Sequence, residues 1–428
     1  MPTLLPYSIY LEGEIEMNLY LLMTALFVAM AALMAADAAL TSYTLLPWFN
    51  GLRWLRVHLI TLGAITEAIF GLLPIIVAIQ AERPRPKFRW DIWLALNIGL
   101  LTLLIGIPII NQALILIGGT LVFIATILLI LQLRELRSMK QEQAAGSKGR
   151  SHNGRKFYIA GLSYFLLGII VGTGLWLGWS DWLKIKTPVE VHIHANNWGF
   201  MTMIFAGLLV DMYPTWAKRP LAWPRSIIPI FWMLTIGALG LVIGPWIKSN
   251  WFSVPGIILF LIGTGWLLLN VIKPLWGDKK AWSQPGLWHI VMAYFWIIAP
   301  VLAAPLIILG VPGFPGAGIE QNAPQALIYG WVLQFGYAFI PYFFYRLFLP
   351  HESARLGGTW LSIVTVNLGG VFLWASIFLA NYQGVLHGTA YLLWTISLVP
   401  IALLLWQILR EGLAKLDNSS ASLSSVSD

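Results

Sequence analysis

The sequence predicts an all-α integral membrane protein with about twelve membrane-spanning helices, arranged as three repeats of four helices. Composition predicts the membrane, because 58% of the 428 residues are hydrophobic and only 10% are charged. A soluble protein carries about 25% charged residues, and a soluble fold could not cover this much apolar surface. A pattern of one polar residue, His or Gln, and two glycines that recurs in every fourth span predicts the repeat.

The spans follow from the length of the apolar windows, since a helix that crosses a bilayer needs about 20 mostly apolar residues. We expect spans at 18–43, 55–80, 91–109, 112–133, 157–180, 190–214, 225–247, 251–273, 287–310, 323–347, 358–381 and 386–409. Pro108 and Asn111 require a very tight turn between the third and fourth spans. We interpret residues 1–417 as one transmembrane domain and the Ser-rich tail, 418–428, as disordered.

Lys and Arg gather in alternate connecting segments, which predicts the orientation. Of the 26 Lys and Arg, 21 lie after even-numbered spans, the C-terminal segment included. Cytoplasmic loops carry an excess of these residues, so both termini are expected in the cytoplasm and the chain in the plasma membrane. Membrane lipid is therefore the expected partner, and the net charge of +8 needs no nucleic acid. The absence of Cys excludes disulfides, iron–sulfur clusters and thiolate-ligated haem.

The predicted repeat rests on similar intervals between one polar residue and two glycines in the second, sixth and tenth spans. The copies are His58/Gly63/Gly71, His194/Gly199/Gly207 and, more weakly, Gln325/Gly330/Gly336. Their starting positions divide the chain at nearly equal intervals. The expected repeats are about 18–133, 157–273 and 287–409. The alternative is that glycine simply recurs where membrane helices touch.

Five histidines lie in or at the ends of predicted spans: His58, His192, His194, His289 and His387. All except His289 lie near the starts of spans that run inward, so these four share the outer third of the membrane. Ionisable groups in spans are functional candidates, and neutral imidazole binds metals and haem iron. His192 and His194 point about 200° apart on a helix, so His194 is the preferred metal ligand. The alternative is a hydrogen-bonding role at each helix end.

Three acidic residues, Asp37, Glu67 and Asp211, also lie within predicted spans. Glu67 follows His58 by nine residues and is expected about 13–14 Å deeper, at 1.5 Å per residue. A buried carboxylate needs a partner or a proton. Each of the three is therefore a candidate for a proton path, or else a hydrogen-bonded structural group.

One span carries a motif that is specific for a family. The stretch HANNWGFMTMIFAG from His194, running to Pro214, resembles the copper-helix motif of the catalytic subunit of haem–copper oxidases, in particular of cbb-type oxidases and nitric oxide reductases. The segment from Ser226 through Gly244-Pro245 resembles the next helix. The resemblance covers nearly the whole chain in topology, but it is specific only in the second, sixth and seventh spans. It implies twelve spans in three pseudo-symmetric arcs of four helices.

The departures from this family lie at its metal ligands. The family has two copper-binding histidines after the Gly-Pro, where this chain has Trp246 and Ile247. It has a His-x-His pair that binds two haems, where this chain has Ala323 and Gln325. The ordinary binuclear centre is therefore expected to be degenerate. This favours a divergent relative, and NnrS-type membrane haem proteins are similar at the level of topology.

The resemblance implies which residues hold a cofactor. His58 is similar to the low-spin haem ligand, and His387 is expected to replace the lost ligand of the tenth span, so that the two hold a haem b. His194, with His192 as the second candidate, is expected at a copper site. Other arrangements are a single axial ligand at His58, a site built around His194, or no haem.

The expected function is therefore a haem-binding membrane protein that transfers electrons or binds nitric oxide or oxygen. If it is an enzyme, the resemblance implies an oxidoreductase. Other respiratory subunits and a cytochrome or cupredoxin electron donor are the expected partners. The alternatives are a cofactor-free structural or assembly subunit of a respiratory complex and, third, a transporter.

Overall fold

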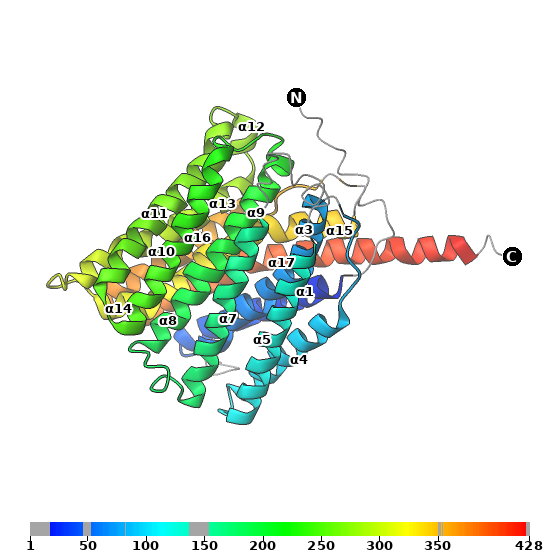
Figure 1. Cartoon of the computed structure of the whole chain (residues 1–428). Helices are drawn as coiled ribbons and strands as arrows, with labels where there is room; N and C mark the ends of the chain where they lie inside the picture. Colours follow the sequence, from blue (N-terminus) through cyan, green and yellow to red (C-terminus); the bar gives the residue numbers. More distant parts are fainter. Residues whose placement is uncertain are drawn as a thin grey trace, which may run out of the picture. The chain divides into compact units, whose positions relative to one another are not determined.

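The computed structural model describes residues 18–45, 53–81, 83–136, 154–349, 352 and 354–424, and all regular structure within them is helical (Figure 1). Eleven of the described helical spans are long and apolar enough to cross a membrane. One further apolar helix, Trp90–Gly106, has 17 residues, which makes it about 25 Å long at 1.5 Å per residue. The chain is thus a multi-pass helical membrane protein, and a helix lies at each of the predicted spans.

The helices are bounded as follows. They are α1 (Leu19–Ser42), α2 (Arg53–His58), η2 (Leu59–Ile65), α3 (Thr66–Gln80), α4 (Trp90–Gly106), α5 (Gln112–Glu135), α7 (Arg155–Leu177), α8 (Pro188–His194), η3 (Ala195–Met201), α9 (Thr202–Ala217), η4 (Pro224–Ser226), α10 (Ile227–Ile247), α11 (Asn250–Ile272), η5 (Lys273–Leu275), α12 (Lys279–Trp282), α13 (Pro285–Ile308), α14 (Gly316–Leu327), η6 (Ile328–Leu333), α15 (Gln334–Phe348), α16 (Trp360–Phe378), η7 (Ala380–Tyr382) and α17 (Gln383–Ser424).

Three of the spans contain a stretch of π-helix, a widened turn that is rare in proteins and common at functional sites. These stretches are η2, η3 and η6, and they follow one another at nearly equal intervals along the chain. Side chains just after each stretch bond to its carbonyl groups. Thr66 Oγ1 donates to Thr61 O at 2.7 Å, Thr202 Oγ1 to Asn197 O at 3.1 Å, and Gln334 Nε2 to Gly330 O at 2.6 Å.

Each π-helical stretch also carries a glycine that faces an aromatic ring of the preceding span. A Cβ atom at Gly63, Gly199 or Gly330 would fall on the ring of Phe27, Tyr164 or Trp296, respectively. Each helix therefore approaches its neighbour at a point where a side chain would not fit. The three spans are also the most buried of the described ones. In their most apolar windows 83%, 78% and 100% of the residues are buried, against 33–44% in the other eight.

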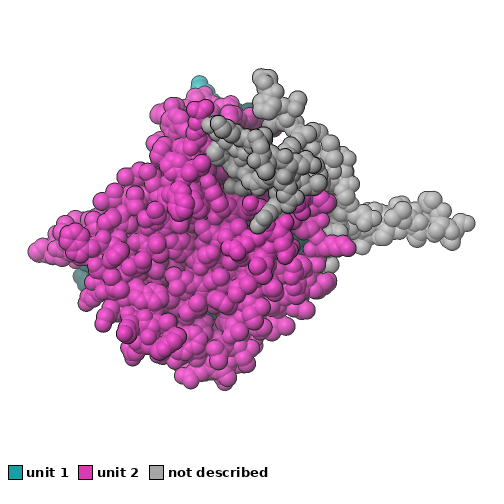
Figure 2. All heavy atoms as spheres, in the orientation of Figure 1, with its two compact units in different colours: residues 1–72, 279–297, 315–428 teal, residues 73–278, 298–314 magenta. Residues whose placement is uncertain are grey.

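The chain forms two compact units, residues 1–72, 279–297 and 315–428 in the first, and 73–278 and 298–314 in the second (Figure 2). In the first unit, α1 packs against both α17 and η2, and α17 also packs against α15 and α16. The N- and C-terminal spans are thus neighbours within this unit. Trp331 and Trp394 are among its largest fully buried side chains.

In the second unit, α4 packs against α5, α5 against α7, and α10 against α11. Helices α8, η3 and α9 form one long span whose neighbours are α7 and α10. The predicted tight turn between the third and fourth spans is present at 107–111. Asn111 caps α5 there by accepting the N–H of Leu114 at 3.1 Å.

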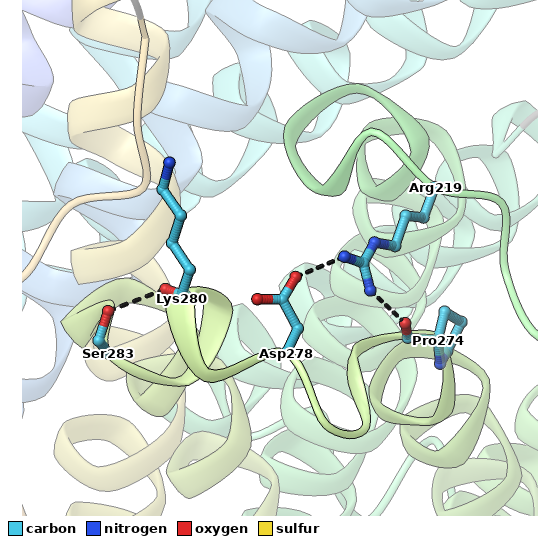
Figure 3. A network of polar contacts seen from close by, with 5 residues as sticks. All are labelled: Arg219, Pro274, Asp278, Lys280 and Ser283. Carbon is cyan, nitrogen blue, oxygen red and sulfur yellow. Dashed lines mark hydrogen bonds and ion pairs between the residues drawn. The ribbon is translucent and has the colours of Figure 1, made fainter.

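A polar network fixes the segment after α9. The guanidinium of Arg219 donates to Pro274 O at 2.7 Å and pairs with the carboxylate of Asp278 at 2.5 Å (Figure 3). These contacts join the α9–η4 connection to η5 and to the segment that follows it, within the second unit. In the first unit, Ser283 Oγ donates to Lys280 O at 2.9 Å and closes the short helix α12 (Figure 3).

The C-terminal tail, residues 418–428, which was predicted to be disordered, is described only in part. Helix α17 continues to Ser424, into the segment 418–428, and residues 425–428 lie outside the described residues. Residues 1–17 lie outside them too. The side of the membrane on which each terminus lies stays a prediction.

Candidate functional site

His58 is the last residue of α2 and directly precedes the π-helical stretch η2. Its Nδ1 lies 2.8 Å from Trp54 O, and its ring stacks on the Trp54 indole with centroids 4.3 Å apart. A carbonyl oxygen only accepts, so the proton of this hydrogen bond is on Nδ1. The lone pair of the imidazole is then on Nε2, the nitrogen that a metal would bind.

His387 lies in the first turns of α17, in the same unit as His58. Its Nε2 is buried and has no hydrogen-bond partner among the described residues. Helix α17 is held against α1 beside it, because the Tyr43 ring packs on Gly388 and the Tyr43 hydroxyl lies 2.9 Å from Thr389 Oγ1. Most buried polar atoms in proteins have a hydrogen-bond partner, so this nitrogen is an exception.

The surroundings of His387 are positively charged and aromatic. Arg53 and Arg56 of α2 lie close enough for their charges to act on the imidazole. The Cζ atom of Arg56 lies 4.7 Å from the ring centroid of Tyr391. The hydroxyl of Tyr391 donates to Gln325 Oε1 on α14. We call these five residues, Arg53, Arg56, Gln325, His387 and Tyr391, the arginine cluster.

The structure does not join His58 to this cluster by any of the contacts that it describes. Arg56 and His58 are two residues apart, which turns their side chains about 200° apart on a helix. Arg56 contacts α17, whereas His58 contacts Trp54 of its own helix. The pairing of His58 with His387 on one haem therefore stays a prediction.

Sequence reasoning missed the arginines and Tyr391. Lys and Arg were considered only for their distribution along the chain, which did not single out Arg53 or Arg56, although α2 begins at Arg53. One signal was available, because His387, Tyr391 and Trp394 follow the i, i+4, i+7 spacing of one helix face. A polar stripe of this kind at the start of a span marks a face that turns away from lipid.

His192 and His194, the candidate copper ligands, contact different helices of the second unit. Nδ1 of His192 lies 2.9 Å from Gly168 O on α7, and Nδ1 of His194 lies 2.6 Å from Leu241 O on α10. The two imidazoles therefore have separate hydrogen-bond partners on two helices. Among the described residues, no group of three or more His, Asp or Glu side chains could hold a metal ion.

The three buried acids differ in their surroundings. Asp211 accepts the N–H of Gly154 at 2.5 Å and the hydroxyl of Tyr158 at 2.9 Å, and so anchors the start of α7. These contacts favour the structural alternative for this residue. Asp37 and Glu67 are both fully buried, on α1 and α3.

His289 is a buried member of a hydrogen-bonded network in the first unit. Its Nε2 lies 2.8 Å from Ser362 Oγ and its Nδ1 lies 3.2 Å from Gln334 Oε1. Asn367 Nδ2 donates to the same Gln334 oxygen at 2.9 Å and its Oδ1 accepts from Trp296 Nε1 at 2.7 Å. Both ring nitrogens are thus occupied, and His289 joins α13 to α15 and α16.

Comparison with known proteins adds no relative: no family model and no curated protein matches the chain.

Proposed function

We propose that the chain is a haem-binding membrane protein built from three four-helix repeats, with His387 as an axial ligand of a haem b. The observation that carries this proposal is the buried Nε2 of His387, which has no hydrogen-bond partner among the described residues. A haem would supply an iron that accepts an imidazole nitrogen and either carries an electron or binds a small diatomic molecule.

The functional groups of the arginine cluster match those of a haem. A haem combines an iron with two carboxylates on one edge of the macrocycle. The cluster offers an imidazole nitrogen for the iron and two guanidinium groups for the carboxylates. Guanidinium groups match carboxylates through paired hydrogen bonds. The residues present therefore fit the group.

Three repeats are supported by features that recur at similar spacing. The π-helical stretches begin at Leu59, Ala195 and Ile328, and each carries a glycine against an aromatic ring of the preceding span. The last two helices of each proposed repeat pack against each other, as α4 with α5, α10 with α11 and α16 with α17. The last helix of one repeat also packs against the first helix of another, as α5 with α7 and α17 with α1.

His58 is the proposed second axial ligand, because its Nδ1 bond to Trp54 O directs the lone pair to Nε2. A hydrogen bond from the other ring nitrogen to a carbonyl is the usual support for a metal-binding histidine. Two imidazoles would give a six-coordinate, low-spin iron. The separate contacts of His192 and His194 support no copper site, so the proposal is confined to haem.

The proposal is tested by the absorption spectrum and haem content of the purified protein. We expect a Soret band with split α and β bands. In His387→Ala the haem is lost or its iron becomes five-coordinate and binds carbon monoxide, and His58→Ala has the same effect. His194→Ala is the matched control, since this imidazole bonds to α10 in the other unit, and its spectrum should not change.

Two outcomes contradict the proposal. A colourless protein after expression with ample haem would favour a cofactor-free subunit. Loss of haem in His194→Ala, with haem retained in His387→Ala, would place the cofactor beside α8 and α10 instead.

A further inference from the structure

Arg56 is a buried cation whose anion is not among the described residues. It is 9% exposed, and its Nε is buried without a hydrogen-bond partner. The described salt bridges join Arg89 to Asp91, Arg219 to Asp278 and Lys415 to Glu352, and none of them involves Arg56. A buried charge without a counter-charge is strongly disfavoured.

The neighbours of Arg56 make the site more positive and supply further donors. Arg53 lies one turn earlier, on the same face of α2. Tyr391 holds the Arg56 guanidinium over its ring, and its own hydroxyl is fixed by Gln325. Tyr329 stacks on Trp394 at 4.0 Å, and its buried hydroxyl has no partner among the described residues.

From this arrangement we propose that Arg56, with Arg53 beside it, binds a carboxylate of a ligand. The forked guanidinium matches the two oxygens of a carboxylate. The carboxylate belongs either to the haem, in which case this inference rests on the proposed function, or to a separate small carboxylate. Tyr391 is a positioning residue, because it holds the guanidinium and its own hydroxyl is already bonded to Gln325.

The first source is tested by comparing haem with its dimethyl ester, in which both carboxylates are blocked. Purified apoprotein should bind haem about tenfold or more tightly than the ester, since a hydrogen bond to a charged group contributes at least about one factor of ten. Arg56→Gln should lose this preference, and Arg56→Lys should keep part of it. Arg346→Gln is the matched control, because Arg346 also lies over a tyrosine ring, that of Tyr342.

The second source is tested by the melting temperature in acetate against chloride of equal ionic strength. If the protein binds the two haem forms alike, acetate should still raise the melting temperature of wild type and Arg346→Gln, but not of Arg56→Gln. If it binds neither form, the haem proposal fails, and the acetate shift alone decides on the carboxylate site. Equal haem affinities without an Arg56-dependent acetate shift would overturn the inference.

Discussion

At the scale of single residues, Asp211 shows how a buried acid can be used for structure. Its two carboxylate oxygens accept from Gly154 N and from Tyr158 Oη, both at the start of α7. Without this carboxylate, a buried N–H and a buried hydroxyl lose a hydrogen-bond acceptor. The loss of one such buried hydrogen bond costs about 1–3 kcal/mol.

We therefore expect Asp211→Ala to lower the free energy of unfolding by about 2–6 kcal/mol, since two buried donors lose their acceptor. Asp211→Asn keeps one acceptor oxygen and should cost less. Tyr158→Phe removes only the hydroxyl, so a double-mutant cycle of Tyr158→Phe with Asp211→Ala isolates this one contact. The measurement is the thermal unfolding of the detergent-purified protein. Unchanged stability in Asp211→Ala would show that the carboxylate does not anchor α7.

The residues of the candidate site were only partly predictable from the sequence. The pattern of histidines at span starts singled out His387, because an imidazole in an apolar window is unusual. It did not single out Arg56, since an arginine at the start of a span is normally a solvated charge at the membrane edge. The Arg56 guanidinium packs on Tyr391 of the last span, and local patterns do not relate that span to α2.

At the scale of helices, α10 and α11 touch through glycines. A Cβ atom at Gly237 would lie 2.8 Å from Phe260 N, and one at Gly256 would lie 2.9 Å from Gly237 O. The pair α4 and α5 repeats this arrangement, because Gly99 and Gly118 face each other's backbone in the same way. Small residues allow membrane helices to approach closely, and packing is a main force that holds them together.

The replacement of Gly237 by Ala should separate α10 from α11 and lower the unfolding free energy by about 1–3 kcal/mol, as in other overpacked cores. Gly265→Ala on α11 is the matched control, because no atom of a neighbouring helix lies within 4 Å of the position that a Cβ atom would take there. That variant should gain up to about 1 kcal/mol from helix propensity. The measurement is the melting temperature, and equal values for the two variants would contradict the close contact.

Helix existence was predictable, whereas helix geometry was not. Each predicted window coincides with a helix, and eleven of the described helical spans are long and apolar enough to cross a membrane. Pro108 and Asn111 indicated the turn between α4 and α5. Hydropathy could not predict the π-helical stretches, because a widened turn has the same composition as an ordinary α-helical turn. Their glycines were visible as a repeat, but the reason for them is the aromatic ring on the neighbouring span, as for Gly199 and Tyr164.

At the scale of the whole molecule, the amino-acid composition predicted that lipid surrounds the chain, and this environment in turn predicted the all-helical fold class. With 10% charged residues, the chain has too few polar groups for a water-exposed surface. Eleven long apolar helices agree with this prediction. The arrangement of the helices depends on contacts between distant spans, such as α1 with α17, and periodicity within one span carries no information on them.

The orientation of the whole chain is a separate prediction, based on the placement of Lys and Arg on alternate sides. The chain has no Cys, so single cysteines can be introduced without background labelling. We expect a membrane-impermeant maleimide to label Asp181→Cys on intact cells, because the exposed Asp181 follows the fifth span. Ser147→Cys, in the basic segment after the fourth span, should react only once the inner face is opened. The reverse pattern would place the basic segments outside, and it would mean that the positive-inside bias does not set the topology of this protein.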